Sequence, residues 1–130
     1  MSITVRNVVK SALRKLMILQ PGEDPSADAM QDAVADLNNM LHAWEMDGIK
    51  LNHTSLVVDD TLPYPDKYHE AIIYNLAVKI APDYETMASQ TVIAVAANGY
   101  ANMQNDLGAP KDIKYPTELT AIYRTNRTYR

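Results

Sequence analysis

The stretch LNNMLHAWEMDGIKL, residues 37–51, indicates the fold more clearly than any other part of the chain. Its large apolar residues repeat at the i, i+3, i+4, i+7 spacing of one helix face: Leu37, Met40, Leu41 and Trp44. Gly48 follows four residues after this single tryptophan and supplies the left-handed residue that commonly ends a helix. The stretch therefore predicts the end of a long amphipathic helix whose apolar face is buried in a core.

Helical spacing continues on both sides of this stretch. The four expected helices cover residues 5–17, 27–47, 66–81, and 86 or 89 to 105. Ser2 or Thr4 is the expected N-cap of the first helix, and Ser26 is that of the second. Because only a short loop with two prolines and a glycine separates them, the first two helices are predicted to pack antiparallel as a hairpin.

The third and fourth helices differ in composition. AIIYNLAVKIA, residues 71–81, is apolar nearly all round, so the third helix should be the most buried, and Pro82 should stop it. The fourth is rich in alanine, which allows close helix approach, although Gly99 lowers the helix propensity of its interior. Four apolar residues share one face of it: Ile93, Ala96, Ala97 and Tyr100.

Two segments lack a sustained helical period. Residues 49–64 alternate short apolar and polar runs and are bounded by Pro63 and Pro65, which favours an extended segment, a hairpin or an arm. Residues 107–130 favour an extended C-terminal arm. We therefore expect a mainly α fold, a bundle of about four helices over residues 1–106, with an extended or hairpin insertion and a separate arm.

Composition limits the classes of protein. With 130 residues the chain forms one domain, and without cysteine it has no disulfide or thiol chemistry. No apolar run approaches the length of a membrane span, and the first residues lack a secretory signal pattern, so we expect a soluble protein made in the cytoplasm.

The net charge of −4 is unevenly distributed along the chain. Residues 1–20 carry +4 and residues 107–130 carry +3, so the middle carries −11. The first helix places Arg6, Lys10 and Arg14 four residues apart on one face. These basic ends predict contacts between neighbouring copies or with an acidic partner, and simple solvated faces remain the alternative.

No chemical motif points to catalysis. The chain has no GxSxG, Walker or GxGxxG sequence, and His42, His53 and His69 do not have a paired metal-ligand spacing. Ser55 could join a triad only by an unsupported arrangement with His53 and an aspartate, and the acids offer only a non-specific glycosidase pair. The acidic candidates are Asp59, Asp60, Glu70 and Glu85. We expect no enzyme, no metal and no cofactor.

Arginine and tyrosine alternate at the C-terminal end. Tyr123, Arg124, Arg127, Tyr129 and Arg130 could bind nucleic acid by phosphate pairing and stacking, or anchor in a protein groove. The acidic middle of the chain and an isoelectric point near 5.2 make a free-standing, sequence-specific DNA binder improbable.

The order of these elements carries a family resemblance over residues 4–105. VVKSALRKLMIL, GEDPSADAMQDAVADLNNMLHAWEMDGIKL and LPYPDKYHEAIIYNLAVKIAPDYE, followed by the alanine-rich helix, together resemble the head-to-tail adaptor family of short-tailed bacteriophages, the packaged-DNA stabilisation or tail accessory proteins. The resemblance implies a ring of twelve copies beneath the portal in the phage neck. Such a ring extends the DNA channel, helps to retain DNA and offers a platform to the next tail or nozzle protein.

The resemblance also implies roles for the charged ends. Portal docking is expected for the arm, by its position, at Tyr115, Tyr123, Arg124, Arg127, Tyr129 and Arg130. Subunit or partner contacts are expected at Arg6, Lys10 and Arg14, and a neutral-to-acidic channel would let DNA pass without sequence-specific contact. The alternatives are a small helical DNA-binding or DNA-packaging protein and, third, a glycan-cleaving tail protein.

Overall fold

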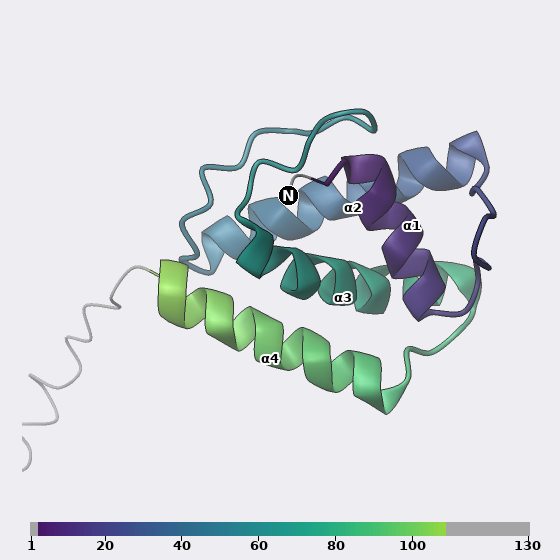
Figure 1. Ribbon diagram of the computed structural model, residues 1–130. Coiled ribbons are helices and arrows are strands. Elements are labelled where there is room, and N and C mark those ends of the chain that lie inside the picture. The colour runs from purple at the N-terminus through teal and green to yellow at the C-terminus, as the bar shows by residue number, and fades with distance from the viewer. Residues whose placement is uncertain (1–2, 109–130) are drawn as a thin grey trace, which may run out of the picture.

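A computed structural model describes residues 3–108 and shows a helical bundle (Figure 1). Its elements are α1 (Val5–Lys15), α2 (Ala27–Met46), the short 3-10 helix η1 (Asp66–Tyr68), α3 (His69–Ile80), a second 3-10 helix η2 (Ala81–Tyr84) and α4 (Gln90–Leu107). The expected mainly α fold with four helices is confirmed. In this part of the chain, β pairing is limited to two isolated bridges.

Hydroxyl side chains begin three of the helices. Thr4 Oγ1 accepts from the Asn7 N–H, in the third residue of α1, at 3.3 Å, and Ser26 Oγ accepts from the Ala29 N–H, in the third residue of α2, at 3.1 Å. Ser89 Oγ caps α4 by accepting from Val92 N–H at 3.2 Å. Each cap satisfies an N–H group that has no partner inside its helix. The predicted start at Ser26 is therefore confirmed, and of the alternatives left open the structure selects Thr4 for α1 and Ser89 for α4.

Left-handed residues end α1 and α2 in the same way. Gly48 has a φ of 97°, and the Ile49 N–H reaches back to the Trp44 carbonyl at 3.0 Å, so the predicted role of Gly48 is confirmed. At the end of α1 the equivalent residue is Met17, with a φ of 62°, and Ile18 N–H donates to the carbonyl of residue 13 at 3.1 Å. Met17 is 91% exposed, so its side chain does not stabilise this strained conformation by packing.

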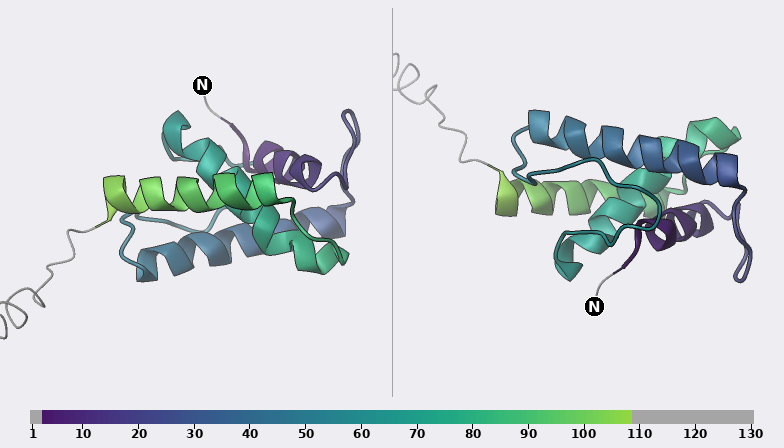
Figure 2. Two further views of the ribbon diagram at one scale, coloured as in Figure 1. Left: turned by 90° about the horizontal axis from the view of Figure 1, so that it is seen from below. Right: turned by 90° about the horizontal axis from the view of Figure 1, so that it is seen from above.

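Helix α3 is the centre of the bundle and packs against each of the other three helices (Figure 2). Of its residues only Glu70 and Lys79 are exposed, which confirms that it is the most buried helix. The predicted α1–α2 hairpin is wrong in its main partner, because α1 packs chiefly on α3 and only secondarily on α2. An apolar helix that can be covered on several sides offers α1 more surface than the single stripe of α2.

Helix α4 lies very close to α3, and Gly99 explains this. A Cβ atom built on Gly99 would lie 2.6 Å from Ala71 Cβ and 2.8 Å from Ala71 Cα. The contact centres the buried face of α4 on this glycine and turns Ile93, 44% exposed, toward solvent. Of the four apolar residues expected on one face, only Ala96 is buried; the buried residues of α4 are Val92, Ala96 and Met103. A small residue at the closest approach, Gly99, together with apolar neighbours, therefore sets the contact face.

The boundaries of the third helix are modified by 3-10 turns. Its α-helical part ends at Ile80, two residues before Pro82, as expected from the proline. The chain nevertheless continues through η2, and Glu85, with a φ of 52°, finally ends the helical path. Pro82 thus changes the helix type, and Glu85 redirects the chain toward α4.

The insertion 49–64 is extended, as predicted, and it connects distant parts of the bundle (Figure 1). Val58 and Asp60 carbonyls accept from the first N–H groups of α1, at 3.0 and 2.9 Å. The start of the insertion bonds to the end of α4 through Lys50 N–H and the Leu107 carbonyl, at 3.1 Å. The backbone hydrogen bonds of the insertion therefore go mainly to helix ends, and they link the start of α1 to the end of α4.

Candidate functional site

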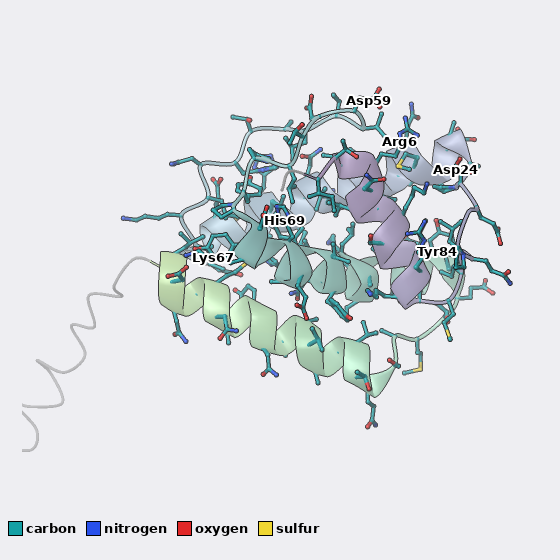
Figure 3. The ribbon with its side chains drawn as sticks, in the orientation of Figure 1. Arg6, Asp24, Asp59, Lys67, His69 and Tyr84 are labelled. Carbon is teal, nitrogen blue, oxygen red and sulfur yellow. The ribbon has the colours of Figure 1, made fainter. Side chains whose placement is uncertain are left out.

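The basic face of α1 is partly neutralised within the chain (Figure 3). Arg6 Nη2 lies 3.2 Å from Asp59 Oδ1 in the insertion, and Lys10 Nζ lies 2.7 Å from Asp24 Oδ1 in the α1–α2 loop. A hydrogen bond from Lys10, together with its charge, lowers the pKa of Asp24. These acids relieve the repulsion expected from like charges four residues apart. The role of these basic residues as contacts with other copies stays a prediction.

Arg14, like Arg6, is exposed, and no ion pair within residues 3–108 involves Arg14. Beside it, Lys15 Nζ lies 5.1 Å from the centre of the Tyr74 ring of α3, a cation–π contact. Arg14 and Lys15 therefore offer positive charge that no ion pair within residues 3–108 neutralises.

Acidic side chains gather at a hollow of 490 Å³ between α2 and η2, which is lined by Asp32, Asp36, Asp83 and Tyr84. Burial, followed by the hydrogen bond and charge of Asp83, raises the pKa of Asp36. Burial and the three carboxylates raise the pKa of Tyr84. The carboxylates of the hollow therefore form a negatively charged surface, which nearby cations neutralise only in part. Its charge is opposite in sign to that of the α1 face.

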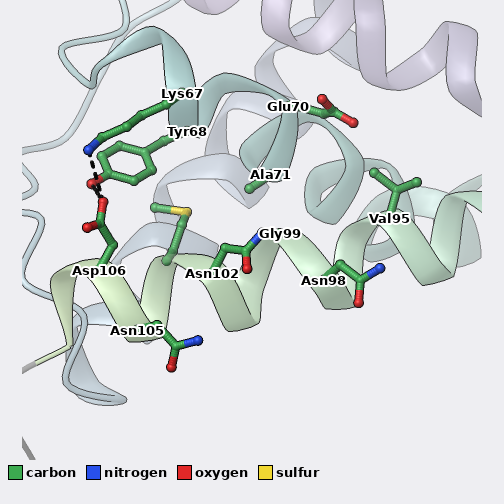
Figure 4. A pocket seen from close by; sticks show the side chains of 11 residues that line it. Lys67, Tyr68, Glu70, Ala71, Val95, Asn98, Gly99, Asn102, Asn105 and Asp106 are labelled. Atoms are coloured by element: carbon green, nitrogen blue, oxygen red, sulfur yellow. Dashed lines mark hydrogen bonds and ion pairs between the residues drawn. The ribbon is translucent and has the colours of Figure 1, made fainter.

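A second concave surface lies between the start of α3 and the adjacent side of α4 (Figure 4). This groove has a volume of 620 Å³, and its floor includes Ala71, Gly99 and Met103. Lys67 Nζ lies 3.1 Å from Asp106 Oδ2 at one end, and the Tyr68 hydroxyl also donates to Asp106. These two donors, Tyr68 first, lower the pKa of Asp106.

Three asparagines follow α4 along this groove at the i, i+4, i+7 spacing: Asn98, Asn102 and Asn105. All three are exposed, and none of their side chains makes a hydrogen bond to another described residue. The groove therefore presents free amide donors and acceptors above an apolar floor.

A buried polar cluster holds the insertion on α2. His53 is 8% exposed; its Nε2 lies 3.0 Å from Asn38 Oδ1, and its Nδ1 pairs with the Tyr64 hydroxyl. Asn38 also bonds both backbone groups of Leu56, at 2.9 Å each, so its oxygen is an acceptor and His53 Nε2 must donate. Glu45 accepts from the His53 backbone N–H.

The environment of this cluster keeps its members neutral. Burial, with a smaller contribution from His42, lowers the pKa of His53, and burial raises the pKa of Tyr64 to about 12. Both His53 ring nitrogens are occupied by Asn38 and Tyr64, so the ring does not activate Ser55. The sequence contains no local signal for this cluster, because the residues of its bonded pairs are 8 to 18 positions apart.

The candidate glycosidase acids lie on three different elements. Asp59 pairs with Arg6, and Asp60 Oδ2 accepts from the Val57 N–H at 2.9 Å, both within the insertion. Glu70 belongs to α3, and Glu85 follows η2. Within residues 3–108 no cluster of three potential metal ligands occurs, and no helix has the length and hydropathy of a membrane span.

The arm residues predicted to dock on a portal lie outside the described residues: Tyr115, Tyr123, Arg124, Arg127, Tyr129 and Arg130. Their role stays a prediction. Comparison with known families gives a match to the family described as P22 tail accessory factor, over residues 1–119. The match covers the bundle, the insertion and the first part of the segment that follows α4.

Proposed function

We propose that this chain, which belongs to the P22 tail accessory factor family, is a structural head-to-tail adaptor of a phage virion. Twelve copies form a ring beneath the portal, extend the DNA channel, help to retain packaged DNA and provide a platform for the next tail component. The family match over residues 1–119 carries the proposal, because it covers nearly the whole chain and denotes a tail accessory factor. The role is structural and non-catalytic.

Opposite charges on the bundle support a head-to-tail contact between copies. Arg14 is exposed on α1, whereas the hollow between α2 and η2 gathers Asp32, Asp36 and Asp83. When one face of each copy binds a different face of the next copy, the copies form a closed ring if the rotation from one copy to the next divides a full circle. In the proposed ring, Arg14 of one copy contacts this acidic hollow of the next, with Arg6 and Lys10 at its margin.

The charge distribution also favours a passive channel over a DNA-binding surface. Residues 21–106 carry −11, and Arg6 and Lys10 already pair with acids of their own chain. Negative charge along the channel repels DNA phosphates and keeps packaged DNA from adhering as it passes. This distribution supports the adaptor over the alternative of a DNA-packaging protein.

Binding to purified portal rings tests the proposal. Sedimentation of the mixture should give a stoichiometric complex, and replacing Arg124, Arg127 and Arg130 by glutamate in the full chain should abolish it. Arg14→Glu should weaken ring formation by roughly tenfold or more through loss of the intersubunit pair. Lys50→Glu is the matched control, since Lys50 is an exposed cation on another element.

Portal binding that survives the triple change would show that the arm is not the anchor. Salt-dependent binding of the wild-type chain to DNA, without any portal complex, would favour the DNA-packaging alternative instead.

A further inference from the structure

The outer face of α4 contains residues that the fold does not explain. Asparagine is among the weaker helix formers, yet Asn98, Asn102 and Asn105 occupy one stripe of an 18-residue helix. Gly99 is explained by its contact with Ala71, but the three amides make no hydrogen bond to another described residue. Local sequence choices that weaken an element without a structural gain commonly mark functional surfaces.

Amide side chains in a row suit the main chain of a polypeptide. Each offers two N–H donors and a carbonyl acceptor, the complement of a peptide group. The stripe spans about 10.5 Å along the helix, the length of about three residues of an extended chain. The groove also has an apolar floor at Ala71 and Met103, where a side chain can be buried (Figure 4).

The chain itself supplies a segment at the mouth of this groove. The described part ends at Gly108, two residues after Asp106, which lines the groove. Twenty-two residues follow, 109–130, with a net charge of +3. The part of α4 that lines the groove, from Val95 to Asp106, is about 17 Å long. Five or six residues of an extended chain span this length. Glu70 and Asp106, against Lys67, give the groove lining a net charge of −1, which complements the positive charge of the segment.

We infer that the free chain binds part of its own segment 109–130, in an extended conformation, along the asparagine stripe of the α3–α4 groove. The short connection from Gly108 makes this contact intramolecular, with an effective concentration in the mM range. Binding needs no portal and no second copy. A segment that docks on a portal would have to leave the groove first, so the groove would hold the arm until assembly.

Hydrogen exchange of the full chain alone, followed by mass spectrometry of its peptides, tests this inference. At short labelling times, amides in part of 109–130 should exchange about tenfold more slowly than the same sequence as a synthetic peptide. The double variant Asn98→Ala and Asn102→Ala should lose this protection, although its helix is stabilised because alanine is the better helix former. A matched double variant, Asn7→Ala and Asn39→Ala, changes exposed helical asparagines elsewhere and should retain it.

Several outcomes would overturn the inference. Exchange of 109–130 at the rate of the free peptide would show that the groove does not hold the segment. Equal protection in the Asn98/Asn102 variant would exclude the stripe as the site. Protection that grows with protein concentration would assign the contact to a second copy. Since no portal is present, these results are independent of the portal-binding test.

Discussion

Replacing Gly99 by alanine tests the packing at the centre of the bundle. The added Cβ would lie 2.6 Å from Ala71 Cβ and 2.8 Å from Ala71 Cα, about 1 Å closer than ordinary contact. Because a backbone atom is involved, the helices must separate, at a cost of about 2–3 kcal/mol. Better helix propensity offsets about 1 kcal/mol. We expect a net loss of about 1–2 kcal/mol, or a melting temperature roughly 5–10 °C lower.

Urea unfolding followed by circular dichroism measures this change. Ala101→Gly, at an exposed position of the same helix, is the control and should cost about 1 kcal/mol through propensity alone. In the double variant Gly99→Ala and Ala71→Gly, the overlap of the two Cβ atoms is removed but the 2.8 Å approach to the Cα of residue 71 remains, so only part of the packing loss should be recovered, seen as a positive coupling between the two sites. If Gly99→Ala stabilised the protein by about 1 kcal/mol, the helices would not be in the close contact on which this reasoning depends.

Three further changes test other parts of the structure. Met17→Gly should stabilise by about 0.5–1 kcal/mol in urea unfolding, since it relieves a left-handed residue whose side chain is exposed; a loss would mean that Met17 packs. Asn38→Ala removes three side-chain hydrogen bonds and should cost about 2–3 kcal/mol, with faster hydrogen exchange in the insertion; unchanged exchange there would contradict its role. His53 is neutral in the fold, so its stabilising contribution is complete above the unfolded pKa of about 6.5 and declines as pH falls toward its lowered folded pKa. The urea midpoint of His53→Gln should therefore lack this part of the acid dependence, and identical pH profiles would refute it.

Local signals in the sequence predicted the helices well. The caps at Thr4, Ser26 and Ser89 and the stop at Gly48 depend only on neighbouring residues, so their chemistry is visible in a single sequence. The buried position of Trp44 also followed from periodicity, although its edge-to-face contact with Tyr100 of α4, 5.4 Å between ring centres, did not.

Contacts between distant segments could not be predicted in the same way. The buried face of α4 is set by the approach of Gly99 to Ala71, and periodicity gives a glycine no weight as a contact residue. Arg6 and Asp59 are 53 residues apart in the sequence. The spacing on α1 therefore predicted the row of basic residues but not the acid that pairs with Arg6. Charge patterns identified the surfaces of interest, and tertiary contacts decided which charges remain unpaired.

The mass of the complex between this chain and a portal ring tests the adaptor role most directly. Native mass spectrometry of portal rings mixed with excess chain should show one dominant species with twelve added copies, and no intermediate stoichiometry at saturation. Portal rings that stay unoccupied, or that take up copies in a broad, unsaturable distribution, would contradict the proposed ring beneath the portal.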